Sequence, residues 1–536
     1  MKKVLTKYFI LAAPFLLLIF GLLIHLYHLT AFPVFADEAI YIRWAQLAMD
    51  DWGRYLFFSL NDGKTPLFIW LLIPFQYLGH LWPQIMPDQL FAARTLSVIV
   101  GLLQAYVMKL ILKKMGLQPK WQWLGAFLTL ILPFWYFQAH LALMDGMLTL
   151  FLMLTFWGLL QIVNLSAVNP VKLFNQRTIW LWICVTGIFY GLAFWTKLPA
   201  LFFLPIFPLM IFWPSGHFKI RERLNLLFPL GAVAFIGLVI FAMMRISPGF
   251  GQLFRRSGDF AYPVSDVLIH GLWRQTLPNI PSYISYFFIY LTPSIVLLSL
   301  AGLFSQRSRS RTIMLLLAAG IMSAPFAVFG KMIYSRYLFP SAIFMTIAAV
   351  INLQAIKQHW INEAKANQFL TKLVAGLIIA LLLANTIASS FVFINSVLFS
   401  PDQTPLASSD RAQYLEDWSS GQGIWETAQY IKQQAKSHTI AVATEGRFGT
   451  LPDGLLLYFH DENVQNVYIE GTGQYPVKSL PDFFVNRAKN FSQSILVVNS
   501  DRMELSLPSN RLLNQYCRPN HKSCLQVWDI TPEVKK

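Results

Sequence analysis

Charged residues are scarce in this 536-residue sequence, at 13% of all residues, whereas soluble domains carry roughly 25%. Hydrophobic residues make up 56%, and the mean hydropathy is +0.50. This balance excludes an ordinary soluble globular protein and indicates an integral membrane protein. The net charge is +16, but the basic residues are spread over short loops between apolar segments. That distribution is typical of membrane topology, so no nucleic-acid partner is predicted.

Cysteine is also scarce, with three residues in the chain. No Cys/His pattern has the spacing of metal ligands, so we expect no metal site and no required cofactor. Cys184 lies inside an apolar segment, whereas Cys517 and Cys524 lie near the C-terminus. In an oxidising compartment the latter two would either pair as a disulfide or remain two thiols, and both alternatives stay open.

Long apolar runs dominate the first 397 residues, and the first of them, 8–29, is long enough to cross a hydrocarbon layer of about 30 Å. About eleven transmembrane helices are predicted, at 8–29, 90–112, 121–139, 145–163, 179–196, 199–213, 224–244, 283–304, 312–329, 334–353 and 371–396. A further apolar stretch, 66–82, is short and interrupted by prolines, so we expect a juxtamembrane or re-entrant element there.

The basic residues set the expected orientation. With the N-terminus in the cytoplasm and 66–82 not spanning, every loop assigned to the cytoplasm is rich in Lys or Arg, as the positive-inside bias requires. The loop 30–89 and the tail from 398 are then extracytoplasmic. A spanning 66–82 would invert the later loops and reverse the bias.

The tail, 398–536, has a different pattern. Short apolar runs at Thr439–Ala443, Val464–Ile469, Ser494–Val498 and Leu525–Ile530 alternate with helical patterns near 424–436, 453–459 and 481–489. Alternating strands and helices predict a small α/β domain with a mainly parallel sheet. The predicted fold is therefore a polytopic helical membrane domain, 1–397, followed by an extracytoplasmic α/β domain, 398–536.

Ionisable and polar residues at the depth of spanning segments are costly and usually face a cavity. The predicted topology places ten informative ones at the extracytoplasmic ends of helices: Asp37, Glu38, Tyr41, Asp62, Lys64, His140, Asp145, Lys197, Lys331 and Arg336. A set of acids and cations on one face fits the transfer of a sugar from a phosphate carrier. Asp37 would take the acceptor proton as general base. Lys64, Lys197 and Arg336 would hold the leaving phosphate.

Each of these residues also has a simpler interpretation. Asp37 and Glu38 suit the start of a helix through its dipole, and Asp145 suits a helix N-cap. The cations suit snorkelling to the membrane interface. His140 is either a second base or a structural histidine.

Six short motifs follow one another in order along the first 340 residues: Asp37-Glu38-x-x-Tyr41, Gly63-Lys64-Thr65-Pro66-Leu67, Ala93-Arg94-Thr95-Leu96-Ser97, Met144-Asp145-Gly146-Met147, Thr196-Lys197 and Arg336-Tyr337-Leu338-Phe339-Pro340. This series resembles the membrane glycosyltransferases of the C-type fold that use polyprenyl-phosphate sugars, in the superfamily of protein O-mannosyltransferases and lipid A aminoarabinose transferases. The resemblance covers roughly residues 1–350.

The resemblance implies a role for each matching residue. Asp37 matches the catalytic base and Glu38 its partner at the acceptor site. Lys64, Lys197 and Arg336 match cations near the carrier phosphate, and Asp145 matches a second acid of the cavity; Tyr41 belongs to the same motif as the base. Thr65 and Leu198 depart from the usual proline and glycine at their positions, which weakens inference about the substrate.

The sequence thus predicts an inner-membrane glycosyltransferase. We expect it to move a sugar from a polyprenyl-phosphate carrier to a hydroxyl of a lipid, glycan or protein, with inversion. Two rivals remain. A lipid or solute transporter would place its ionisable residues near mid-membrane. A membrane-anchored binding or assembly protein would work through its tail and tolerate the loss of Asp37.

Overall fold

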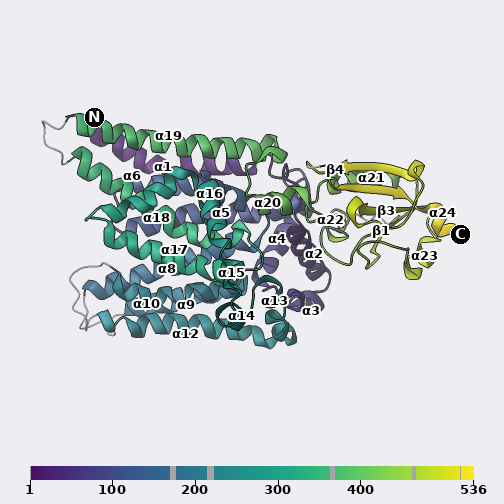
Figure 1. The fold of residues 1–536 in the computed structure, drawn as a ribbon, viewed down its shortest axis with the longest axis horizontal. Helices are drawn as coiled ribbons and strands as arrows, with labels where there is room; N and C mark the ends of the chain where they lie inside the picture. Colours follow the sequence, from purple (N-terminus) through teal and green to yellow (C-terminus); the bar gives the residue numbers. More distant parts are fainter. Residues whose placement is uncertain (1, 169–176, 214–222, 363–368, 461–465, 520) are drawn as a thin grey trace. The chain divides into compact units, whose positions relative to one another are not determined.

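The structure is a computed structural model that describes residues 2–168, 177–213, 223–362, 369–460, 466–519 and 521–536. The chain divides into two compact units (Figure 1). The first, called here the helical unit, comprises residues 1–27, 57–68 and 97–397. The second, called the sheet unit, comprises residues 28–56, 69–96 and 398–536. Each is described by itself.

Eight helices among the described residues are long and apolar enough to cross a membrane. They include α5 (Gln89–Lys114), α8 (Met144–Val168), α9 (Arg177–Thr196), α12 (Leu227–Ala242), α16 (Asn279–Ala301), α17 (Arg309–Phe329), α18 (Phe339–Ile356) and α19 (Phe369–Phe399). The protein is therefore a multi-pass helical membrane protein. The helix α1 spans Lys2–Leu26, and Ala12–Leu26 is counted as its apolar part. The shorter helices are α4 (Leu67–Leu81), α6 (Pro119–Ile131), α7 (Pro133–Ala139), α10 (Ile206–Leu209), α13 (Ser257–Phe260), α14 (Val264–Leu268) and α15 (Trp273–Thr276).

Small residues bring α9 and α12 into close contact, side by side in Figure 1. A Cβ at Gly191 would lie 2.6 Å from Ile240, and one at Gly237 would lie 2.4 Å from Tyr190. Between apolar helices the attraction comes from such close packing, because lipid is as apolar as the helices themselves. The close packing of α9 fixes the position of its C-terminal end, which leads directly into Lys197.

Prolines break two of the predicted spans. The segment 121–139 is divided into α6 and α7 at Leu132, whose ψ of 137° is not helical, because a residue before proline is pushed out of the α region. The segment 199–213 is a 3-10 turn, Leu198–Phe203, followed by the short α10 and a second 3-10 turn, and it contains Pro199, Pro205 and Pro208. The helix α4, at 15 residues, is shorter than a usual span.

The tail carries the predicted small α/β domain, visible in yellow in Figure 1. Its five strands are β1 (Ile440–Thr444), β2 (Val467–Gly471), β3 (Gln493–Asn499), β4 (Leu512–Cys517) and β5 (Cys524–Asp529), in the order β2-β1-β3-β5-β4. The helices of this part are α20 (Ser408–Arg411), α21 (Ile424–Gln434), α22 (Asp453–Leu456), α23 (Asp482–Ala488) and α24 (Thr531–Lys535). Buried Leu496, Val498, Phe484 and Ile530 lie in its core.

The sheet is mixed, so the prediction of a mainly parallel sheet is wrong. β1 pairs in parallel with β2 and β3, whereas β5 runs antiparallel to both β3 and β4. The six residues between β4 and β5 are too few for the crossover that a parallel pair requires. Cys517 and Cys524, opposite each other in this hairpin, form a disulfide in the structure.

Two helices from the loop 30–89 belong to the sheet unit. They are α2 (Ala36–Asp50) and α3 (Trp52–Tyr55), and α2 packs against α22 of the tail. Gln46 of α2 donates to the carbonyl of Leu457 at 3.0 Å. Next to this contact, the carboxylate of Asp453 is buried and accepts a hydrogen bond from the Gly449 N–H at 2.7 Å.

Asp453 predicts a pH dependence of stability. Burial raises its pKa to about 7, against the opposing effects of the Gly449 hydrogen bond and Arg43. The folded chain therefore holds a proton that the unfolded chain releases above about pH 4. Stability from this group falls as the pH rises from about 4 to 7, by up to about 4 kcal/mol, and is constant above that. Asp453→Asn keeps the acceptor oxygen and is expected to flatten this fall.

The measurement is the thermal unfolding midpoint of the full chain between pH 4.5 and 8. Asp402→Asn, at an exposed position of the same unit, is the control and should keep the wild-type pH profile. Equal profiles for wild type and Asp453→Asn would contradict the prediction.

Candidate functional site

An ion pair joins the ends of two neighbouring helices in the helical unit. Asp145 lies in the first turn of α8, where the helix dipole favours an anion. Lys197 directly follows α9, and its Nζ lies 2.7 Å from Asp145 Oδ1. The Asp145 side chain is 6% exposed and that of Lys197 is 21% exposed. The pair is thus shielded, while part of the Lys197 side chain remains exposed.

Arg336 lies near this ion pair, in the 3-10 turn Ser335–Leu338 that leads into α18. Its guanidinium is 5.3 Å from the ring of Tyr334 and 5.7 Å from that of Tyr337. Lys197 Nζ is 5.5 Å from the same Tyr337 ring. One aromatic ring therefore contacts both cations, and Tyr337 is itself stacked on Phe326 at 4.9 Å.

Lys64 adds a third cation. It follows Gly63, whose φ of +71° is a left-handed conformation that suits glycine, and its N–H donates to Ser59. The turn is anchored because Asp62 pairs with Arg256.

Lys197 lies just beyond the end of α9, outside the spanning helix. Burial lowers its pKa, Asp145 raises it, and the positive charges of Arg336 and Lys64 lower it further.

Lys197 is therefore within electrostatic reach of Asp145, Arg336 and Lys64. These four residues form a partly exposed surface that carries three cations. Such a surface favours a bound anion, and a guanidinium suits the oxygen geometry of a phosphate.

The acidic pair of the first loop lies in the sheet unit. Glu38 is fully buried, and its two carboxylate oxygens accept hydrogen bonds from Arg94 Nε at 2.9 Å and Nη2 at 2.8 Å. Arg94 also donates to the backbone carbonyls of Leu29, Phe32 and Pro33. Glu38 in turn accepts from the Phe35 N–H at 2.9 Å. This network fixes the loop 29–35 that leads into α2.

Asp37, one residue earlier, is half-buried in the first turn of α2. Backbone pairing with the tail holds the strand before it: Ala36 N–H donates to Ser419 at 3.0 Å, and Gly421 N–H donates to Val34 at 2.7 Å. Tyr41, one turn along α2, is buried and its ring lies 6.2 Å from that of Trp44.

The structure thus brings the predicted site residues into two groups. Lys64, Asp145, Lys197 and Arg336 form one group in the helical unit, and Asp37, Glu38 and Tyr41 form the other in the sheet unit. His140 is buried against Tyr136 and His25, with ring centroids 4.1 and 5.2 Å away, as expected for a structural histidine. Among the residues that the structure describes, no group of three or more His, Cys, Asp or Glu side chains is placed to hold a metal ion.

Sequence reasoning did not identify the partners of these residues. Arg94 was visible in a motif, and a lone arginine at the start of an apolar helix is a signal of a buried acidic partner. Tyr337, next to Arg336, was visible only as a member of the same motif. Arg256, the partner of Asp62, comes from a distant segment, and no local signal connects the two.

Solved structures share this fold. ArnT from Cupriavidus metallidurans bound to undecaprenyl phosphate aligns with a TM-score of 0.55 and 16% identity, over 96% of this chain and 97% of that one. The same enzyme in the apo state aligns at 0.54 and 15%, over 97% and 98%. An Archaeoglobus fulgidus oligosaccharyltransferase tethered to an acceptor peptide aligns at 0.53 and 10%, over 92% of this chain and 69% of that one. At these identities the likeness establishes the fold alone.

The sequence itself defines the class. Residues 63–242, about a third of the chain, match the family model of dolichyl-phosphate-mannose-protein mannosyltransferases. No curated protein sequence matches the chain significantly. The chain is a membrane glycosyltransferase that carries a domain of this mannosyltransferase family, which confirms the resemblance predicted from the motifs.

Proposed function

We propose that this enzyme transfers a sugar from a polyprenyl-phosphate carrier to a hydroxyl group of a lipid, glycan or protein at the extracytoplasmic face. The observation that carries the proposal is the cluster of Lys64 and Arg336 around the Lys197–Asp145 ion pair. The family description names a lipid-phosphate mannose donor, and the similar ArnT structure holds undecaprenyl phosphate. These findings argue for an enzyme and against the transporter alternative.

The reaction needs two chemical contributions. The acceptor oxygen forms a bond to the anomeric carbon from the side opposite the phosphate, the bond from that carbon to the phosphate oxygen breaks, and the configuration inverts. Asp37 takes the proton of the acceptor hydroxyl as general base. The three cations hold the carrier phosphate as its negative charge grows, so they stabilise the transition state more than the ground state.

Glu38 acts differently from Asp37 in this proposal. Both of its oxygens are occupied by Arg94, so it is a positioning residue that fixes the start of α2. Asp145 holds Lys197 in place through their ion pair. Tyr41 supports the inner face of α2. The proposed mechanism assigns no step to a metal ion.

The orientation follows from the charges of the loops. We propose about eleven crossings, with the broken and shorter apolar segments completing the eight long helices, the N-terminus in the cytoplasm and the tail 398–536 outside. Lys and Arg in the loops assigned to the cytoplasm support this orientation. The Cys517–Cys524 disulfide fits an oxidising compartment.

Arg336→Ala tests the phosphate site. Undecaprenyl phosphate without a sugar is the probe, and its equilibrium binding to the purified chain in lipid nanodiscs is the measurement. Binding is expected to weaken about tenfold or more, because charged hydrogen bonds are worth about 1.5–3 kcal/mol. Arg336→Lys should recover only part of the loss, since the ammonium lacks the planar fork.

The matched control is Arg245→Ala. Arg245 is an arginine of the helical unit whose guanidinium lies 5.7 Å from the Phe250 ring, so it also lies near an aromatic ring, but it is exposed and does not belong to the cluster. Its loss should leave binding unchanged. Equal affinity of wild type and Arg336→Ala would remove the phosphate from this cluster.

A further inference from the structure

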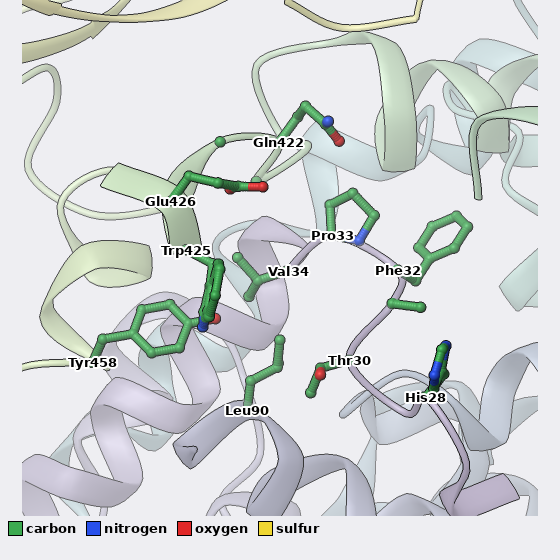
Figure 2. A pocket seen from close by; sticks show the side chains of 13 residues that line it. His28, Thr30, Phe32, Pro33, Val34, Leu90, Gln422, Trp425, Glu426 and Tyr458 are labelled. Atoms are coloured by element: carbon green, nitrogen blue, oxygen red, sulfur yellow. The ribbon is translucent and has the colours of Figure 1, made fainter. Parts of the chain in front are cut away.

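A pocket lies within the sheet unit, and none of the residues assigned above to the base or the phosphate lines it. Its volume is about 400 Å³, within the range of about 300–1,000 Å³ found for small-molecule sites. One wall is the loop 28–34 that follows α1, and the other is the segment 421–426 with Tyr458 of the tail (Figure 2). Leu90, near the start of α5, contributes an apolar contact between them.

The shape of the tail wall depends on two glycines. Gly421 donates to the Val34 carbonyl at 2.7 Å, and a Cβ at Gly421 would lie 2.4 Å from that same oxygen. Gly423 has a φ of +83°, and its Cβ would lie 2.5 Å from Tyr516. Gln422 lies between the two glycines, and α21 begins directly after Gly423. The shape of this wall is therefore set by backbone contacts.

The side chains of the pocket combine aromatic surface with hydrogen-bonding groups. Trp425 is half exposed and Tyr458 is buried. Burial raises the pKa of Tyr458 well above its ordinary value, with a contribution from the negative charges of Asp88, Glu38 and Glu426, so its hydroxyl stays protonated. Figure 2 shows Trp425, Glu426 and Gln422 on one side and His28, Thr30 and Phe32 on the other.

The charge of the pocket argues against a phosphate. Glu426 is the acidic side chain of the lining, and among the described residues that line the pocket none is Lys or Arg. An aromatic ring beside a carboxylate and an amide is suited to a pyranose, whose C–H face stacks on the ring while its hydroxyls donate to the carboxylate and the amide oxygen. An amino sugar gains a charge-assisted bond to Glu426 as well.

We infer that the pocket formed by Trp425, Tyr458, Glu426 and Gln422 binds a neutral or amino sugar residue, and that this sugar belongs to the acceptor. The assignment to the acceptor rests on the proposed function, in which the donor phosphate occupies the cationic cluster of the helical unit. The acceptor would then be a glycan or glycolipid.

Saturation-transfer NMR on the full chain, purified in a detergent without a sugar head group, tests the inference. The probes are methyl glucoside, methyl glucosaminide and inorganic phosphate. Saturation should transfer from the protein to the ring protons of both sugars. The line width of the phosphate signal should be the same with the wild type and with Glu426→Gln. Trp425→Ala should weaken sugar binding about fivefold, from the loss of about 1 kcal/mol of stacking, and Trp425→Phe should restore most of it.

Trp52→Ala is the matched control, because Trp52 is 56% exposed in the same unit, against 50% for Trp425, and does not line the pocket. It should leave both sugar signals unchanged. Glu426→Gln should weaken methyl glucosaminide more than methyl glucoside, whereas Glu470→Gln, at an exposed strand position, should affect neither. Absence of transfer in the wild type, or an equal loss in Trp52→Ala, would overturn the inference.

This experiment contains no donor, so its failure is distinguishable from failure of the proposed function. Loss of sugar binding would leave phosphate binding at Arg336 untouched. A chain that binds the sugars but shows no Arg336-dependent binding of undecaprenyl phosphate would retain the pocket and lose the transferase mechanism.

Discussion

Asp37→Asn lowers the rate of sugar transfer by about 10²–10⁴-fold, the usual contribution of a general base. The amide has the shape of the carboxylate but cannot take the acceptor proton. Because Asp37 is half-buried in the first turn of α2 and the ion pair that fixes this turn belongs to Glu38, the fold should survive the change. The measurement is the initial rate of transfer from polyprenyl-phosphate donors in membrane vesicles that contain the variant.

Asp50→Asn is the matched control, because it changes the same chemical group at the other end of α2, on the exposed side. It should keep most of the wild-type rate. Undecaprenyl phosphate binding should be equal in wild type and Asp37→Asn, since the cations are unchanged. A rate within a few-fold of wild type would eliminate Asp37 as the base and favour the interpretation in which the tail alone does the work.

Arg94→Met is expected to destabilise the chain by about 3–5 kcal/mol, the cost of breaking a buried ion pair. The side chains of Arg94 and Glu38 are fully buried, and Arg94 also serves three backbone carbonyls. Its removal leaves a buried carboxylate without its partner and the loop 29–35 without its anchor. Denaturant unfolding of the purified chain measures the loss.

A double-mutant cycle separates the ion pair from the carbonyl contacts. The combination of Glu38→Gln with Arg94→Met should cost less than the sum of the two single changes, because no unpaired charge remains. Arg54→Met, at an exposed arginine of the same unit, should stay within about 0.5 kcal/mol of wild type. Additive effects of the two single changes would show that Glu38 and Arg94 do not stabilise each other.

The class of fold was predictable because the length of an apolar run is set by the thickness of the membrane. The prediction of spanning helices failed where a long apolar run does not form one continuous helix. Residues 121–139 contain no charge, yet Leu132-Pro133 divides them, and three prolines shape 199–213 into short turns. Hydropathy measures the cost of leaving water and does not measure the hydrogen bonds that proline removes.

The sheet shows a second limit. Four of its strands were predicted within a few residues, because each contains a short run of apolar or β-branched residues. β4 was missed: its sequence, Leu-Leu-Asn-Gln-Tyr-Cys, alternates in burial and carries two amides. The direction of β5 depends on its pairing with that missed strand, so the antiparallel half of the sheet was not predictable.

The charged residues of the candidate site were conspicuous in the sequence, but their contacts were not. Lys197 and Arg336 were conspicuous because a charge among aromatic and apolar neighbours requires a reason. Asp37 and Glu38 are adjacent and chemically alike, and successive residues on a helix point about 100° apart. The orientation of this turn in the folded chain decides which of the two carboxylates pairs with Arg94. No local sequence pattern contains that information.

The backbone pairing of residues 34–36 with 419–421 has a consequence for how the enzyme is made. The residues that pair with 34–36 are synthesised nearly four hundred residues after Asp37. The acid-bearing turn therefore acquires its final backbone contacts only when the tail has been made and folded. The proposed base is therefore made well before the residues that support it, and a chain that stops before residue 419 lacks these contacts altogether.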